Sequence, residues 1–464
     1  MKNINRNKSF LIVALAIVFL GISCKKSFYT DANKNLNAPD SSSIVPSVML
    51  STVEGSLAYT QGGDFSRYTS LLMQQTSSTS RQAGAYYQYI FTSQDFDSPW
   101  GNLYTSVMQN NRVLIEISDG KGDNGYGGIA RVIMAYSLEL AVDNWGSIPY
   151  SQAFMGSNNY QPTYDNDKAL YDTMFSLLNV AIAKLSNSNA DPDAPGGEDV
   201  IYGGDLTKWT KFAHAIKARL YIHQSKGDPT MATNALSEIA QSFTSNADNA
   251  QYLFSGGTET SANPWYQFNE QRGDIVFDLS PLGMELKASD DPRYTIFTTP
   301  LDAQGNYDDV NVVGMGDYYG SISAPVEFIT YDELLFMTAE ATIRTSGSIS
   351  TAQTSYQAAI TKNMEKLGVA PGDIVTYVAA NGTLPATGAG ADAIAKVAAQ
   401  EYIALYLNPE AFTLWRRTGS PVLPPVIGNK IPRRFLYPET EVSYNGANVP
   451  KSVTLYAPTI FWDK

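Results

Sequence analysis

Apolar residues recur at intervals of three and four through most of the chain beyond residue 46, and this spacing is the strongest constraint on its fold. Between residues 129 and 140, for example, the apolar side chains keep to one face of a helix. Similar segments follow at 168–186, 206–225, 331–345, 350–367, 391–407 and 410–418. Asp205 can cap the 206–225 helix and Gly368 can end the 350–367 helix. The sequence therefore predicts a mainly α fold.

Several predicted helices form pairs joined by short turns, 168–186 with 206–225 and 331–345 with 350–367. Pairs of this size resemble tetratricopeptide helix-turn-helix units, although the strict 34-residue repeat is absent. The stretches 246–327 and 427–464 are rich in Gly, Pro and aromatic residues without a sustained period. We expect long loops and short strands there, forming a loop-rich half over the helical layer, because loops of such length are usually functional.

The N-terminus has the pattern of a bacterial lipoprotein signal. Three cations precede the apolar run 10–20, which is short for a membrane span, and Gly21-Ile22-Ser23-Cys24 follows at once. Cys24 is the only cysteine of the chain, so it cannot form an intramolecular disulfide. We predict a signal peptide at 1–23, a lipid anchor on Cys24, a tether at 24–46 and one binding domain at 47–464. The alternative is a short N-terminal anchor with a chance cysteine.

The composition narrows the choice of partners. The formal net charge is −13, which disfavours nucleic acid and anionic lipid headgroups. Charged residues make up only 17% of the chain and aromatic residues 12%, with 29 tyrosines. Tyrosine combines an apolar face with a polar rim, which suits uncharged polar ligands such as sugars and peptides. The alternative is that extracellular bacterial proteins are commonly rich in these residues, whatever they bind.

A series of short motifs runs along the chain in a fixed order. Asp143-Asn-Trp-Gly-Ser-Ile-Pro-Tyr150 follows one predicted helix, and Glu410-Ala-Phe-Thr-Leu-Trp-Arg-Arg-Thr-Gly419 forms another. The others are Pro162-Thr-Tyr-Asp165, Ile201-Tyr-Gly-Gly-Asp205 with Lys208-Trp209 and Lys217-Ala-Arg219, Asp291-Pro-Arg293, Ala339-Glu-Ala341, Arg434-Phe-Leu-Tyr-Pro438 and Phe461-Trp-Asp463. Behind a lipoprotein signal, this set resembles the SusD/RagB family, in its SusD-like type 2 branch. The resemblance covers nearly the whole predicted mature chain.

The resemblance implies properties that composition does not show. Such proteins are lipid-anchored on the outside of the outer membrane of Bacteroidota, and they are not enzymes. They cover a SusC-like TonB-dependent transporter and deliver captured glycan or peptide to it. Their fold is mainly α, with four tetratricopeptide-like pairs and a loop-rich ligand-binding half. Gly21 departs from the Leu that is usual at this place in a lipoprotein signal.

Ligand contacts are expected from exposed aromatic and polar side chains on loops. The Tyr-dense segment 81–89 shows no helical period and lies between two helical regions, which predicts a binding loop. The predicted ligand-binding residues are Arg81, Tyr86, Tyr87 and Tyr89 from this segment, together with Asp64, Trp265 and Tyr319. For each residue the alternative is ordinary packing. Glycan is the first predicted ligand and peptide the second.

Two motifs are interpreted as architecture. Gly146 allows a tight turn and Trp145 fills a gap between helices. Arg416 and Arg417 could clasp a ligand carboxylate, but pairing of one with a buried acid such as Glu340, while the other binds carbonyls or water, is favoured.

Evidence for an enzyme is weak. His214 and His223 are nine residues apart on one predicted helix, so they point to opposite sides. No nucleophile elbow, zinc-protease motif or phosphate loop is present. A glycosidase needs only two carboxylates, so a surface glycosidase remains the rival hypothesis. A further rival is a lid for the transporter that has no ligand of its own.

A metal site is weakly indicated. The carboxylates at 191, 193, 198 and 199 could bind Ca²⁺, but a solvated acidic loop is favoured. We predict neither a metal nor a cofactor.

Overall fold

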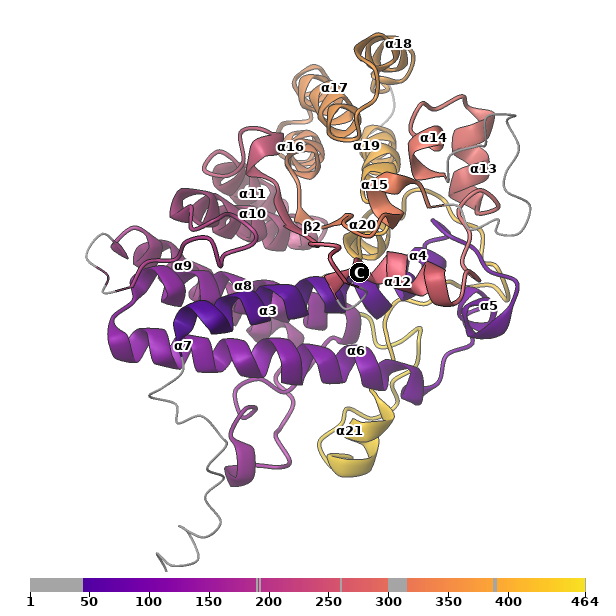
Figure 1. Cartoon of the computed structure of the whole chain (residues 1–464). Coiled ribbons are helices and arrows are strands. Elements are labelled where there is room, and N and C mark those ends of the chain that lie inside the picture. The colour runs from indigo at the N-terminus through magenta and orange to yellow at the C-terminus, as the bar shows by residue number, and fades with distance from the viewer. Residues whose placement is uncertain are drawn as a thin grey trace, which may run out of the picture. The chain divides into compact units, whose positions relative to one another are not determined.

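A computed structural model describes residues 45–188, 191, 193–258, 261–298, 315–386 and 390–463. The predicted signal 1–23, the anchor Cys24 and nearly all of the predicted tether 24–46 lie outside this part of the chain. Most of the described residues are helical (Figure 1), which confirms the mainly α fold. No helix in the described part is both long enough and apolar enough to cross a membrane.

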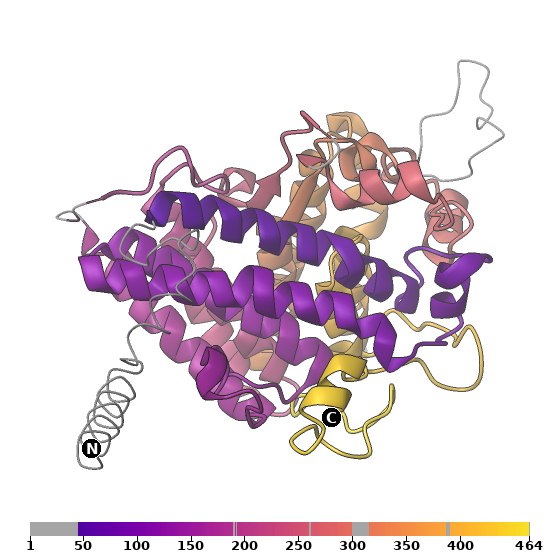
Figure 2. The same cartoon turned by 60° about the horizontal axis from the view of Figure 1, so that its bottom comes forward.

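The first half of the described chain contains two nearly continuous helical rows and two longer helices. One row is α3 (Pro46–Thr60), η2 (Gln61–Phe65) and α4 (Ser66–Leu72), followed by α5 (Arg81–Tyr87). The other row is η3 (Ser93–Phe96), α6 (Asp97–Gly101), η4 (Asn102–Met108) and α7 (Gln109–Lys121). The longer helices are α8 (Asn124–Trp145) and, after η5 (Gly156–Asn158), α9 (Asp167–Leu185). The rows lie side by side, α3 against α7 (Figures 1 and 2).

The second half alternates longer helices with short elements. It contains α10 (Leu206–Gln224), α11 (Thr230–Ile239), η7 (Asn246–Asp248), β1 (Ala250–Leu253), α12 (Pro264–Gln271), α13 (Pro281–Ala288), α14 (Tyr294–Phe297), α15 (Asp317–Gly320) and β2 (Pro325–Ile329). It ends with α16 (Tyr331–Ser346), α17 (Ile349–Lys366), α18 (Pro371–Asn381), α19 (Gly390–Ala404), α20 (Glu410–Thr418) and α21 (Glu439–Tyr444).

The helices that pack most extensively against each other are neighbours in the sequence. α16 packs against α17, as the sequence predicted. The predicted pair 168–186 with 206–225 is only partly correct, because α9 packs mainly against α8 and α10 mainly against α11 (Figure 1). Local caps fix the ends: the Asp205 carboxylate accepts from the N–H groups of Thr207 and Lys208 at 3.0 and 3.1 Å.

The segment 246–327 is more regular than predicted. Strands β1 and β2 pair antiparallel, as short strands were expected to do. Four short helices, α12 to α15, lie between them, so the prediction of long loops here is wrong in part. Asn263 and Ser280 cap α12 and α13, and each cap is followed by a proline at the first helical position.

The prediction of a loop at 81–89 is also wrong. Residues 81–87 form α5, and Tyr86 and Tyr89 are only 6% and 5% exposed. The Tyr86 ring stacks on Phe91 with 4.4 Å between the ring centroids. These rings are therefore packed in the core, where they stabilise the fold.

The first helical row contains a π-helical turn at Gln61–Phe65. Helix η2 continues α3 into α4, with non-helical torsions at Gly63. Gly62 is tightly enclosed, because a Cβ built there would lie 2.6 Å from Cγ2 of Val326 and 2.9 Å from Cγ of Pro264. A second π-helical segment, η4, lies in the neighbouring row. Such segments are rare and often mark functional sites.

Trp145 fills the gap between helices, as predicted. Its side chain is fully buried, its indole donates to the Leu436 carbonyl at 2.8 Å, and its ring packs edge-on against Phe65 and Trp100. Gly146 follows with a φ of +79°, which a residue with a side chain rarely adopts.

Candidate functional site

A cleft of about 150 Å³ lies where α4, α5 and the end of α12 meet. It combines charged, amide and aromatic side chains from three segments. Its lining consists of Asp64, Arg67, Tyr68, Leu71, Gln82, Ala83, Tyr86, Phe268, Arg272 and Ile275. We refer to it as the Arg67 cleft.

Two arginine–aspartate pairs frame the Arg67 cleft. Arg67 bonds to Asp64 at 2.6 Å, and Arg272 bonds to Asp274 at 2.8 Å. Both guanidinium groups lie over the Phe268 ring, 5.0 and 5.4 Å from its centroid. Such contacts hold the cations in place while the paired carboxylates offset their charge.

Arg67 has unused hydrogen-bonding capacity. A guanidinium group has five N–H donors, and within the described chain Arg67 donates one hydrogen bond, to Asp64. The side chains of Arg67 and Asp64 are 18% and 23% exposed, so both reach solvent at the cleft. The exposed amide of Gln82 donates one hydrogen bond to Asp95 at 3.1 Å and contributes its second N–H and its carbonyl oxygen to the cleft. The cleft is therefore suited to a ligand that bears several hydroxyl or carbonyl groups.

The floor of the cleft is fixed by a bond between Tyr86 and Asp95. The Tyr86 hydroxyl donates to the Asp95 carboxylate at 2.5 Å. Burial alone would raise the pKa of Asp95, but hydrogen bonds from Tyr86 and Thr92 hold it below its usual value. Asp95 is therefore ionised at neutral pH and orients the Tyr86 ring.

The structure brings only some of the predicted ligand residues together. Asp64 and Tyr86 line the Arg67 cleft. Trp265 and Tyr319 instead line a small cavity of about 30 Å³, and both side chains are buried. The Trp265 indole donates to the Ser66 hydroxyl at 2.9 Å. Their predicted contact with ligand stays a prediction.

The other three predicted residues are not among those that line the cleft. Arg81 donates to the Arg272 carbonyl at 3.4 Å. Tyr87 is half-buried. The Tyr89 hydroxyl accepts from the Val426 N–H at 3.0 Å. These contacts are structural, and a ligand role for these residues remains a prediction.

Sequence reasoning did not single out Arg67, Phe268 or Arg272. A local signal existed, since Arg67 follows Asp64 by three residues and Arg272 follows Phe268 by four, which places each pair on one helix face. No sequence spacing could indicate that the two pairs meet, because about 200 residues separate them.

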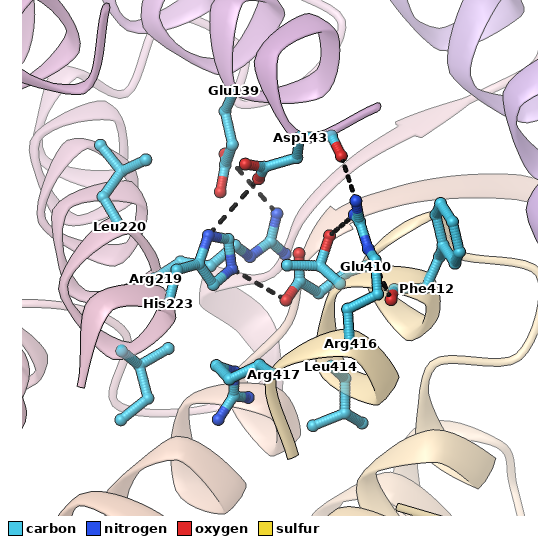
Figure 3. A network of polar contacts seen from close by, with 12 residues as sticks. Glu139, Asp143, Arg219, Leu220, His223, Glu410, Phe412, Leu414, Arg416 and Arg417 are labelled. Atoms are coloured by element: carbon cyan, nitrogen blue, oxygen red, sulfur yellow. Dashed lines mark hydrogen bonds and ion pairs between the residues drawn. The ribbon is translucent and has the colours of Figure 1, made fainter. Parts of the chain in front are cut away.

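Four side chains form a buried cluster at α8, α10 and α20 (Figure 3). Glu139, Asp143, His223 and Glu410 each bring a potential metal-ligand atom within 4.8 Å of the others. Arg219 lies 3.8 Å from Glu139 and supplies a positive charge to the cluster.

The imidazole and two of the three carboxylates of this cluster are already bonded. His223 contacts the Tyr171 hydroxyl through Nδ1 and Glu410 through Nε2, both at 2.9 Å. Asp143 accepts from Tyr171 and from the Trp462 indole at 2.6 and 3.1 Å. The donor types would suit a divalent cation, but these bonds join four helices, α8, α9, α10 and α20, and the C-terminal segment. We assign the cluster to packing, and the absence of a metal stays a prediction.

The histidines and the paired arginines lie as predicted. His214 contacts Glu238, whereas His223 contacts a different set of residues on the other side of α10. Arg417 pairs with Glu340, and Arg416 donates to the backbone carbonyls of Asp143 and Arg433. Neither arginine is available to a ligand.

The acidic segment 191–199 was expected to be solvated, and this is wrong for Asp199, which is 2% exposed. Its carboxylate accepts from the N–H groups of Ile201, Tyr202 and Gly204 and from the Trp209 indole. Asp199 therefore shapes the turn before α10.

A frame of paired helices of this kind defines a tetratricopeptide-like helical protein, here with a polar cleft. The chain belongs to the SusD-like type 2 family, because residues 37–438 match the model of this family, described as starch-binding and associating with the outer membrane. The predicted resemblance is thereby confirmed. No curated protein matches the chain.

Solved structures agree on the fold. A SusD/RagB family protein from Bacteroides thetaiotaomicron superposes with a TM-score of 0.72 at 21% identity, covering 91% of this chain and 99% of that one. A SusD homologue from Bacteroides fragilis gives 0.73 at 22% identity, covering 91% and 99%. A chitin-binding SusD homologue from Flavobacterium johnsoniae gives 0.72 at 21% identity, covering 90% and 97%. Family and fold together support a carbohydrate- or nutrient-binding role.

Proposed function

We propose that this protein is a lipid-anchored, surface-exposed glycan-binding protein of the outer membrane. It captures oligosaccharide or polysaccharide in the Arg67 cleft without chemical change and delivers it to a SusC-like TonB-dependent transporter. The family description supports the association with the outer membrane. The lipid would be carried by Cys24.

The observation that carries this proposal is the unused donor capacity of Arg67 beside Asp64, Gln82 and Phe268. A sugar hydroxyl both donates and accepts, so it can bond to a guanidinium and a carboxylate that lie next to each other. Each hydrogen bond to a charged group contributes about 1.5–3 kcal/mol. The binding of chitin by a structural neighbour is consistent with a glycan ligand.

The test is retention of the purified full chain on affinity gels that contain different polysaccharides, followed by calorimetry with the retained glycan. We expect Arg67→Gln to weaken binding about tenfold or more, since one charge-assisted hydrogen bond is lost. Arg112→Gln is the matched control, because Arg112 is 48% exposed on α7 and does not line the cleft.

Each alternative has its own outcome. Release of reducing sugar from a retained glycan would establish a glycosidase. Binding of peptide pools with no glycan retained would assign the cleft to peptide, and no ligand at all would leave only the lid role.

A further inference from the structure

A second cavity lies where α3, η4 and the β1 region meet. It has a volume of about 340 Å³, within the range of ligand pockets. Tyr59 on α3 and Tyr252 and Phe254 from the β1 region contribute its aromatic walls, and Ser56, Asn102 and Ser106 contribute hydroxyl and amide groups. We call it the Tyr59 cavity.

Tyr59 is the accessible aromatic wall of the cavity, whereas Tyr252 is half-buried and Phe254 is buried. Tyr59 is 45% exposed, unlike Tyr86 of the cleft, which is 6% exposed. The Tyr252 and Phe254 rings meet at 68° with centroids 5.0 Å apart. Gly55 lets the tip of Tyr252 approach α3, because a Cβ there would lie 3.2 Å from the Tyr252 hydroxyl. Together they form a concave aromatic surface.

The described residues that line the Tyr59 cavity carry no formal charge. A charged ligand would lose hydration there without gaining a counter-charge, which is unfavourable. A neutral sugar ring can instead stack its apolar face on an aromatic ring and direct its hydroxyls to serine and asparagine. The cavity is therefore complementary to neutral saccharide units.

The Tyr59 cavity and the Arg67 cleft are connected by direct contacts. The Tyr59 hydroxyl donates to Oε1 of Gln267 at 3.3 Å, and the next residue, Phe268, lines the cleft. Tyr59 and Arg67 also belong to one helical row, eight residues apart, or about 12 Å along its axis. The π-helical segment η4 contributes Asn102 and Ser106 to the Tyr59 cavity, and the other, η2, lies between Tyr59 and Arg67.

We propose that the Tyr59 cavity is a second subsite, which binds neutral sugar units of an extended oligosaccharide whose other end lies in the Arg67 cleft. This inference rests on the proposed function of the cleft, and it names the ligand class as a neutral chain of several units. Short oligosaccharides need only one of the two sites.

The test is calorimetry of the purified full chain with a panel of neutral chito-, malto-, xylo- and laminari-oligosaccharides, each as a di- and a hexasaccharide. Ser56→Arg places a long charged side chain in the cavity, and Tyr59→Ala removes an aromatic wall. We expect each to weaken hexasaccharide binding about tenfold and to leave the disaccharide unaffected. Tyr160→Ala is the control, because Tyr160 is 77% exposed and does not line the cavity.

Thermal unfolding of every variant verifies that it is folded, and the half-buried Ser56 side chain makes no hydrogen bond within the described part of the chain. Unchanged hexasaccharide affinity in Ser56→Arg, or no binding by any oligosaccharide of the panel, would overturn the subsite. If Arg67→Gln lowers the hexasaccharide affinity and Ser56→Arg does not, the Arg67 cleft is supported as the glycan site and the Tyr59 subsite is rejected. The opposite pattern would retain the Tyr59 cavity and reject the cleft.

Discussion

The guanidinium of Arg417 on α20 pairs with the carboxylate of Glu340 on α16, and both side chains are at most 1% exposed. Burial alone would raise the pKa of Glu340, but Arg417 and Arg344 hold it below its usual value. The carboxylate is therefore ionised, and the pair joins two helices that are far apart in the sequence.

Replacing Arg417 with Met should therefore strongly destabilise the fold. The change leaves Glu340 with Arg344 alone, and an incompletely paired buried charge costs about 3–5 kcal/mol. Urea denaturation measures this loss as a change in the free energy of unfolding. Arg112→Met removes a pair of which both partners are largely exposed, so it should cost under about 0.5 kcal/mol. Equal losses in the two variants would show that burial of the Arg417 pair contributes nothing.

Glu54 gives a pH-dependent prediction. Burial, and secondly the charge of Asp199, raise the pKa of Glu54 well above its usual value. Its protonated form therefore stabilises the fold fully below the unfolded pKa of about 4.3, and this contribution is lost as pH rises through the folded pKa.

Glu54→Gln removes this titration and can still accept from the Val200 N–H, which bonds to Glu54 at 2.8 Å. The melting temperature of the variant minus that of the parent should increase from about pH 4.5 to about pH 8. Differential scanning calorimetry at several pH values measures it, with Glu116→Gln as the control because Glu116 is 60% exposed. A difference that is constant with pH would mean that Glu54 is ionised throughout.

Two glycines of neighbouring helical rows should respond in opposite directions to alanine. Gly62→Ala forces a methyl group against Val326 and Pro264, so it should cost about 1–3 kcal/mol. At Gly101 the torsions are helical, and a built Cβ would meet no atom within 4 Å. Gly101→Ala should therefore stabilise the fold by about 0.5–1 kcal/mol. Thermal unfolding distinguishes the two, and equal effects would contradict tight packing at the π-helical turn.

Features with a local cause could be predicted from the sequence. Helix α20 spans Glu410–Thr418, as expected, because Gly419 ends it with a φ of +73°. The pairing of Arg417 with Glu340 followed from a general rule, that a cation within an apolar motif requires a buried acid. The tight turn at Gly146 and the packing role of Trp145 were also predicted correctly, because both follow from the residue type itself.

Features with a long-range cause could not be predicted. Helix α5 has only seven residues, too few to show a period, and its burial depends on contacts such as that of Tyr86 with Phe91. The Arg67 cleft needs Phe268 beside Arg67, a contact across about 200 residues that no spacing records. Four of the predicted site residues, Tyr86, Tyr89, Trp265 and Tyr319, were therefore found buried, and the arginines that frame the cleft were missed.

A substitution of Tyr86 tests whether this residue acts mainly in the structure, as its contacts indicate, or in ligand binding, as the sequence predicted. Its hydroxyl bonds to Asp95 and its ring stacks on Phe91, so Tyr86→Phe keeps the stack and removes only the hydrogen bond. We expect a loss of stability of about 1–3 kcal/mol, because Asp95 loses a partner. This loss should become smaller at acid pH, because the bond helps to hold the pKa of Asp95 low and its contribution disappears as pH falls through that pKa.

Glycan affinity should remain within about twofold in Tyr86→Phe, since its hydroxyl is occupied by Asp95 and Arg67 supplies the free donors. Calorimetry on the folded variant measures this, with Arg67→Gln as the comparison. If Tyr86→Phe instead weakens glycan binding as much as Arg67→Gln while stability is unchanged, the tyrosine hydroxyl contacts the ligand directly. The original prediction of Tyr86 as a ligand residue would then hold, and its bond to Asp95 would be a feature of the unliganded state alone.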